Sequence, residues 1–200
     1  LCLEGWLHDG AHSCAPILPA EPCPDGFMAA PGDAGWRPVM LCSEDPWGES
    51  PIDASTVFVL AGSSGDGSEV HDLSITGPEM GIIASGATGL WFDRVHVLDT
   101  GRRGIDVEDP LGPVDALVTR SLFERNLESG WYANGATLVV EKSALRDVGF
   151  NQGIARGVNS QSSAEGKPAN VTVRGSVIER IGDAGMLSWG GHLDVEGSVI

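Results

Sequence analysis

Apolar residues recur in short alternating runs along the last two thirds of the chain, and the runs repeat at a fixed spacing. The segment 171–178, Val-Thr-Val-Arg-Gly-Ser-Val-Ile, returns at 193–200 as Leu-Asp-Val-Glu-Gly-Ser-Val-Ile, an offset of 22 residues. Alternation is the period of a half-buried strand, and a fixed period indicates stacked structural units. The same register extends backwards through 138–140, 116–118 and 90–92.

One apolar position in each unit marks the register, and we call it the anchor. Successive anchors are separated by 22, 26, 22, 33 and 22 residues, so two units carry insertions of 4 and 11 residues. The anchors are Ile75, Val97, Phe123, Leu145, Ile178 and Ile200.

Each unit also contains two recurrent breaks in the alternation. A polar or glycine-containing pair interrupts the phase between the first two apolar runs, as at 93–94, 174–175 and 196–197. About eight residues after each anchor, a glycine precedes a large apolar residue, as in Gly104-Ile105, Gly130-Trp131, Gly153-Ile154 and Gly185-Met186. Three short strands and three bends per unit predict an all-β parallel β-helix.

This pattern resembles the right-handed parallel β-helix repeats of the pectate-lyase-like superfamily, over roughly residues 70–200. The resemblance implies a right-handed solenoid of about five to six coils, each of about 22 residues. It implies no single function, because unrelated chemistries use this scaffold.

The remainder of the chain differs in composition. Residues 1–51 are rich in Cys, Pro and Gly, and they resemble the Cys-rich leaders of some bacterial secreted or surface-anchored proteins, for instance at 23–33. Residues 52–69 form a transition, with a predicted strand at 55–60 and a loop at 62–68 that could cap the solenoid. Residues 70–200 form the predicted β-helix, which stops in mid-repeat. The chain begins with Leu1, so we expect a trimmed piece of a longer protein.

All four cysteines lie in the first segment: Cys2, Cys14, Cys23 and Cys42. No C-x-x-C spacing occurs, so we predict two disulfides rather than a zinc site, with the three pairings left open. His8 and His12 with Cys14 could imitate a metal site, but a disulfide for Cys14 is the favoured interpretation, and no metal is assigned.

The formal net charge of −16 argues against a nucleic-acid partner, because basic patches supply that affinity. No apolar run is long enough to span a membrane. With the cysteines, these features predict an extracellular, periplasmic or cell-surface location.

Two excursions, 108–113 and 157–169, account for the long anchor spacings. Both follow the third strand of a coil, so we expect them on one side of the solenoid, as the walls of a groove. Insertions on one face of a repeat protein often mark its binding face.

The best candidate site lies at the first of these excursions. Ile105 and Val107 should point inward, which directs Asp106 and Glu108 outward, about 6.5–7 Å apart. That spacing suits the acid and base of inverting glycoside hydrolysis, or a bound Ca²⁺. The predicted catalytic residues are Asp106, Glu108, Asp109 and Arg156, with Tyr132 and Asn134 as ligand-binding residues. The structural alternative is a solvated acidic strand end.

Three further files of polar residues have a structural interpretation. Leu98, Glu124, Arg146 and Glu179 follow the anchors by one residue, and Asp99, Arg125, Asp147 and Arg180 follow them by two. Because their charges alternate from coil to coil, both files predict ion-pair ladders. The serines Ser121, Ser143, Ser176 and Ser198 predict an inward ladder of hydroxyls.

Two hypotheses on function follow. The first is a non-catalytic scaffold or a glycan- or protein-binding module. The alternative, which the superfamily resemblance implies, is a polysaccharide lyase or glycoside hydrolase that acts on an acidic glycan through the carboxylate cluster.

Overall fold

The computed structural model describes residues 6–8, 14–17, 19–20, 27–29, 33–38 and 56–200. Two short antiparallel strand pairs lie in the described ranges before residue 39. Strand β1 (Trp6–His8) pairs with β2 (Cys14–Pro16), and β3 (Phe27–Met28) pairs with β4 (Arg37–Pro38). The predicted disulfides fall on cysteine side chains outside the described part of the chain.

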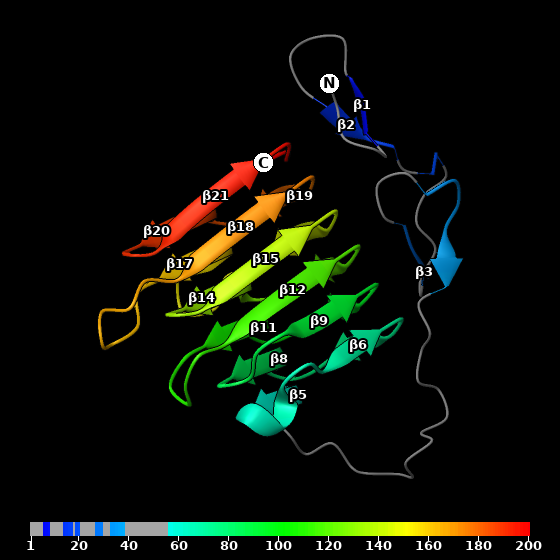
Figure 1. The fold of residues 1–200 in the computed structure, drawn as a ribbon. Coiled ribbons are helices and arrows are strands. Elements are labelled where there is room, and N and C mark those ends of the chain that lie inside the picture. Colours follow the sequence, from blue (N-terminus) through cyan, green and yellow to red (C-terminus); the bar gives the residue numbers. More distant parts are fainter. Residues whose placement is uncertain (1–5, 9–13, 18, 21–26, 30–32, 39–55) are drawn as a thin grey trace.

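From residue 56 the chain winds into a right-handed parallel β-helix, as the sequence predicts (Figure 1). Each coil contributes one strand to each of three parallel sheets. We call the sheets A, B and C in the order in which a coil such as β6–β7–β8 passes through them. Sheet A contains β6 (Glu69–His71), β9 (Leu90–Asp93), β12 (Asp115–Thr119), β15 (Thr137–Glu141), β18 (Asn170–Arg174) and β21 (His192–Glu196). Sheet B contains β7 (Ser74–Thr76), β10 (His96–Leu98), β13 (Leu122–Glu124), β16 (Ala144–Val148) and β19 (Val177–Ile181). Sheet C contains β5 (Thr56–Ala61), β8 (Met80–Ser85), β11 (Arg103–Glu108), β14 (Glu128–Asn134), β17 (Ala155–Gln161) and β20 (Ala184–Trp189).

The anchors form one continuous row in sheet B. Ile75, Val97, Phe123, Leu145 and Ile178 are register partners from coil to coil, and each is at most 1% exposed. Ile200 is the exception at 65% exposed, although its neighbour Val199 bridges Val177 at the expected offset. Coils average about 26 residues rather than 22, because two of them carry the insertions.

The phase breaks between sheets A and B are single residues in the left-handed region. At this corner φ lies between 50° and 55° at Asp72, Arg94, Arg120, Lys142, Gly175 and Gly197. The corner after sheet B repeats the device at Asp99, Arg125, Asp147 and Arg180, with φ between 52° and 57°. One left-handed residue turns the chain sharply, so strands of only three to seven residues can close a coil.

A file of glycines opens sheet C toward the anchors. In each case the nearest obstacle to an added Cβ includes the next anchor side chain or the backbone of the next coil. The file consists of Gly81, Gly104, Gly130, Gly157 and Gly185. The predicted member Gly153-Ile154 is therefore wrong, and Gly157-Val158 takes its place, because Val158 pairs with Trp131 and Met186.

The long insertion is divided between two corners. A turn closed by the Asn151–Ile154 bridge precedes β17, and a loop at 162–169 follows it. The predicted excursion at 157–169 is thus wrong over 157–161, which belong to β17. The shorter insertion forms the loop 109–114 after β11, close to its predicted position.

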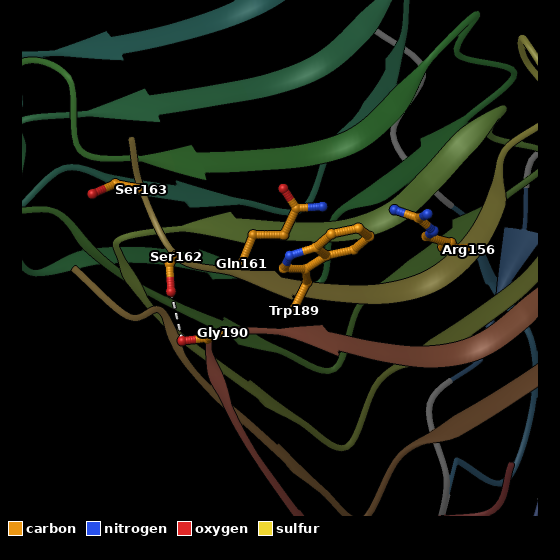
Figure 2. Close-up of a pocket in the computed structure, with 6 residues that line it drawn as sticks. All are labelled: Arg156, Gln161, Ser162, Ser163, Trp189 and Gly190. Carbon is orange, nitrogen blue, oxygen red and sulfur yellow. Dashed lines mark hydrogen bonds between the residues drawn. The ribbon is translucent and has the colours of Figure 1, made fainter. Parts of the chain in front are cut away.

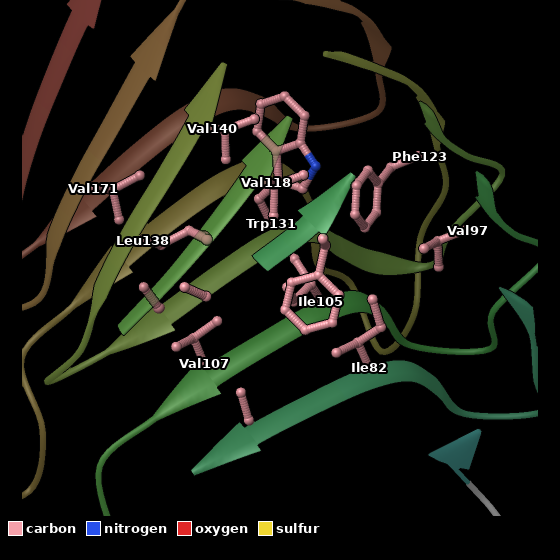
Figure 3. Close-up of a cluster of buried hydrophobic side chains, with 14 of the residues drawn as sticks. Ile82, Val97, Ile105, Val107, Val118, Phe123, Trp131, Leu138, Val140 and Val171 are labelled. Carbon is pink, nitrogen blue, oxygen red and sulfur yellow. The ribbon is translucent and has the colours of Figure 1, made fainter. Parts of the chain in front are cut away.

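Apolar side chains from all three sheets fill the centre of the coils (Figure 3). The largest fully buried side chain in this core is Trp131, whose ring lies edge-on to that of Phe123, with 5.9 Å between the ring centroids. Close-packed interiors of this kind fix the stacking of the coils.

Strand β5 extends sheet C at the first coil, pairing in parallel with β8. A strand was predicted at 55–60, close to this position. The segment 62–68 that follows is a loop, as predicted, and includes one 3-10 turn, η1 (Ser63–Gly65).

The predicted ion-pair ladders are confirmed at the corner after sheet B. Arg125 Nε lies 2.7 Å from Asp99, Arg146 Nε lies 2.7 Å from Glu124, and Arg180 Nε lies 2.6 Å from Asp147. Each contact joins successive coils. A similar cluster, which the sequence reading missed, surrounds the buried Asp93, to which Arg94 and Arg120 both donate.

The serine file is a ladder, although its bonds differ from those predicted. Each hydroxyl accepts a hydrogen bond from the backbone N–H one coil below, at 3.1 Å from Ser121 to Ser143 and from Ser143 to Ser176. Each hydroxyl also donates to the carbonyl two residues before it, as from Ser143 to Glu141 at 2.9 Å. The hydroxyls therefore satisfy backbone groups at the corner rather than one another.

Candidate functional site

The outer face of sheet C carries most of the predicted site residues. Ile105 and Val107 are fully buried, so Asp106 and Glu108 alternate onto the outer face. Register places Asp106 beside Tyr132 and then Asn159, and Glu108 beside Asn134 and then Gln161. Tyr132 and Asn134, the predicted ligand-binding residues, therefore lie next to Asp106 and Glu108 on the neighbouring coil.

Asp106 is not the solvated acid that the structural alternative expected, because it is only 2% exposed. Arg103 donates to its Oδ2 at 2.6 Å and to Glu128 at 2.7 Å. The guanidinium of Arg103 also lies 3.8 Å from the centroid of the Tyr132 ring. Arg102 completes the cluster with a 2.9 Å bond to Glu128. This chain of alternating charges holds the Arg103 guanidinium over the face of the tyrosine ring.

The two acids in this cluster have pKa values shifted in opposite directions, although burial acts on both in the same direction. Burial raises the pKa of Asp106; Arg103 opposes the rise and Glu108 adds to it, with a result of about 6. Burial acts in the same direction on Glu128, but Arg102 and Arg103 outweigh it and lower the pKa of that carboxyl. One acid that titrates near neutrality beside one that stays ionised is a frequent feature of functional sites.

A network of amides continues from Tyr132 across the next coil. The Tyr132 hydroxyl donates to Gln161 Oε1 at 3.1 Å and accepts from Asn134 Nδ2 at 3.2 Å. Gln161 Nε2 in turn donates to Asn159 at 3.2 Å. These bonds fix the Gln161 amide from both ends.

An open pocket of about 570 Å³ lies where the amide network ends (Figure 2). Its lining residues come from β17, β20 and the turns after them: Arg156, Gln161, Ser162, Ser163, Trp189 and Gly190. Trp189 is 70% exposed, and in Figure 2 its indole lies between Gln161 and Arg156. The turn at Gly190 keeps the rim tight, because Ser162 Oγ donates to the Gly190 carbonyl at 2.6 Å.

The two loops after β11 and β17 lie on the same side, and one contact bridges them. Lys167 Nζ in the second loop lies 3.4 Å from Asp109 Oδ2 in the first. The bridge crosses the intervening coil at Gly135, where an added Cβ would lie 2.6 Å from the Asp109 carboxylate. The loops therefore meet over this coil.

The structure divides the predicted catalytic residues into separate groups. Asp106 belongs to the buried arginine cluster, Asp109 to the loop bridge, and Arg156 to the pocket, which neither carboxylate lines. The sequence reading missed Arg103, Glu128 and Trp189. Trp189 could have been predicted from the register of sheet C. Ser188 pairs with Ser160, so the next residue, Trp189, continues the row of outward positions that contains Gln161.

Within the described ranges, no three His, Cys, Asp or Glu side chains gather in a way that could hold a metal ion. The same residues contain no helix long and apolar enough to cross a membrane. Comparison with known proteins found no matching family, no similar curated protein and no matching solved structure.

Proposed function

We propose that this β-helix is a secreted or cell-surface binding module that holds a glycan on the outer face of sheet C without altering it. The observation that carries the proposal is Trp189, an indole left 70% exposed at the edge of an open pocket. An exposed aromatic ring offers a flat apolar surface for the apolar face of a sugar.

The polar lining supports the same function. Ser162, Ser163 and the Gln161 amide stand around the indole, and such groups can bind sugar hydroxyls. Gln161 is already oriented by Tyr132 and Asn159, so little side-chain freedom is lost when a ligand binds. The net charge of −16 argues against nucleic acid as the ligand.

Substitution of Trp189 tests this function. We expect Trp189→Ala to weaken glycan binding about tenfold or more, as the loss of a central aromatic contact does. Affinity would be measured by calorimetry against oligosaccharides that a glycan array has identified with the wild-type chain. Phe150→Ala is the matched control, since Phe150 is also an exposed aromatic (58%) but does not line the pocket. Equal affinity of wild type and Trp189→Ala would refute the proposal.

A polysaccharide lyase or glycoside hydrolase acting on an acidic glycan is the second candidate. It is favoured by the raised pKa of Asp106, which suits a general acid near neutral pH. The 2% exposure of Asp106 and its bond to Arg103 favour a supporting role instead, because a catalytic acid must reach its substrate. Release of new reducing or unsaturated ends by the wild type, abolished in Asp106→Asn, would establish the enzyme.

A further inference from the structure

We infer that the pocket selects an anionic sugar, one that bears a carboxylate or a sulfate, and that Arg156 is the residue that reads this charge. The inference rests on the proposed glycan-binding function and specifies its ligand class. It begins from the state of Arg156 compared with the other arginines of the chain.

Arg156 differs from every other arginine whose side chain the structure describes. The others each lie within 4.0 Å of at least one carboxylate: Arg94, Arg102, Arg103, Arg120, Arg125, Arg146, Arg174 and Arg180. Arg156 has no such partner among the described residues, although the chain contains 28 acidic residues and 12 basic ones. The positive charge of Arg156 is therefore not neutralised by a neighbouring carboxylate of the described residues, although the chain is strongly acidic.

Arg156 is half-buried, and the burial of one of its nitrogen atoms makes this unpaired state costly. The guanidinium Nε is buried and has no hydrogen-bond partner. A buried charged donor without a partner loses its hydration and recovers nothing inside the protein. Because Arg156 also lines the open pocket, an anionic group there would give the guanidinium a counter-charge, and guanidinium–carboxylate contacts are among the strongest hydrogen bonds available.

The rest of the pocket fits the same ligand. None of its lining residues is acidic, so within the described part of the chain no carboxylate in the pocket competes for Arg156 or repels an anion. The Ser163 hydroxyl is a second buried polar atom there without a partner. Trp189 and Arg156 line the same pocket, so one sugar ring could stack on the indole while its acidic substituent meets the guanidinium (Figure 2).

The test compares an anionic glycan with its uncharged ester and with a second anionic glycan. Calorimetry would measure the binding of a glucuronate-containing hexasaccharide, of its carboxyl methyl ester, and of a hexasaccharide whose only charged groups are sulfates. We expect wild type to bind one of the anionic ligands about tenfold or more tightly than the ester, and Arg156→Gln to lose that preference. The carboxylated and sulfated ligands distinguish the two sources of negative charge.

Arg174→Gln is the matched control, because it removes the same charge from an arginine that is half exposed on sheet A and already paired with Glu141. It should keep the wild-type preference. A preference that survives in Arg156→Gln, or wild-type affinity for both anionic ligands that is no higher than for the ester, overturns the inference while leaving glycan binding intact. Failure of wild type to bind any glycan overturns both proposals, and an effect of Trp189→Ala without one of Arg156→Gln overturns only this one.

Discussion

At the scale of single residues, the glycine file of sheet C decides how closely the sheets pack. An added Cβ at Gly130 would lie 2.1 Å from Leu145 Cδ1, and one at Gly104 would lie 2.7 Å from the Gly130 carbonyl. Leu145 is fully buried and has no room to withdraw. The absent side chains therefore allow each anchor to reach the backbone of the preceding coil.

Gly130→Ala should consequently destabilise the solenoid. We expect a loss of about 1–3 kcal/mol in the free energy of unfolding, the usual cost of overpacking a filled core. Urea unfolding followed by circular dichroism would measure it. Gly35→Ala serves as the control, because nothing lies within 4 Å of an added Cβ there. A Gly130→Ala protein as stable as wild type would mean that the core is looser than the close contacts require.

At the scale of elements, the corner between sheets A and B depends on side chains to complete its hydrogen bonds. A chain that turns at a left-handed residue leaves the next backbone N–H groups without a strand partner. The serine hydroxyls accept these bonds one coil further on, as Ser143 does for the Ser121 N–H. Each corner is thereby tied to its neighbour.

Ser143→Ala tests the importance of this ladder. The Ser121 N–H would remain buried without an acceptor, so we expect a loss of about 1–3 kcal/mol of stability. Amide hydrogen exchange at Ser121 should accelerate as well, and that measurement separates a local effect from a global one. Ser64→Ala removes an exposed hydroxyl and should change neither quantity. Unchanged exchange at Ser121 in Ser143→Ala would show that the ladder bond is dispensable.

At the scale of the whole molecule, stacked coils interact only with their neighbours, so charge pairs between coils contribute to the coupling that makes the solenoid cooperative. Glu124 is one of the most connected of these carboxylates. It accepts hydrogen bonds from Arg125 at 2.8 Å and from Arg146 at 2.7 Å, and its Oε1 lies 2.9 Å from His96 Nε2. Burial alone would raise the pKa of Glu124, but His96 and Arg146 lower it to about 2.

The stability of the protein should therefore depend on pH in two windows. The Glu124 contribution is complete above pH 4.5 and is lost as the pH falls toward 2, because the unfolded chain binds the proton more tightly. Asp106 acts with the opposite sign. Its folded pKa of about 6 exceeds the ordinary 3.8, so its ionisation lowers stability as the pH rises through that interval.

Unfolding free energies measured between pH 2 and 7 would check both windows. Glu124→Gln should flatten the fall below pH 4.5, and Asp106→Asn should flatten the change between pH 3.8 and 6. Glu165→Gln, an exposed position in the loop at 162–169, should leave the profile unchanged. An acid profile that is the same in wild type and Glu124→Gln would contradict the assignment of the lower window.

Periodicity in the sequence alone determined the all-β solenoid, the anchor row and the ion-pair ladders after sheet B. These features depend on residues at a constant offset, and stacking converts a constant offset into direct contact. The outward alternation of Asp106 and Glu108 followed from the same rule, because neighbours on a strand point to opposite faces.

Only the tertiary structure decided what happens where the offset varies. The long insertion divides around β17, so Gly157 rather than Gly153 occupies the glycine file, and spacing cannot reveal that division. Burial of Asp106 depends on Arg103, which precedes it on the strand, and on Glu128 and Tyr132 from the next coil. The unpaired state of Arg156 depends on where every nearby acid lies. Such properties depend on which residues meet in space, and the order of residues along the chain does not by itself predict those contacts.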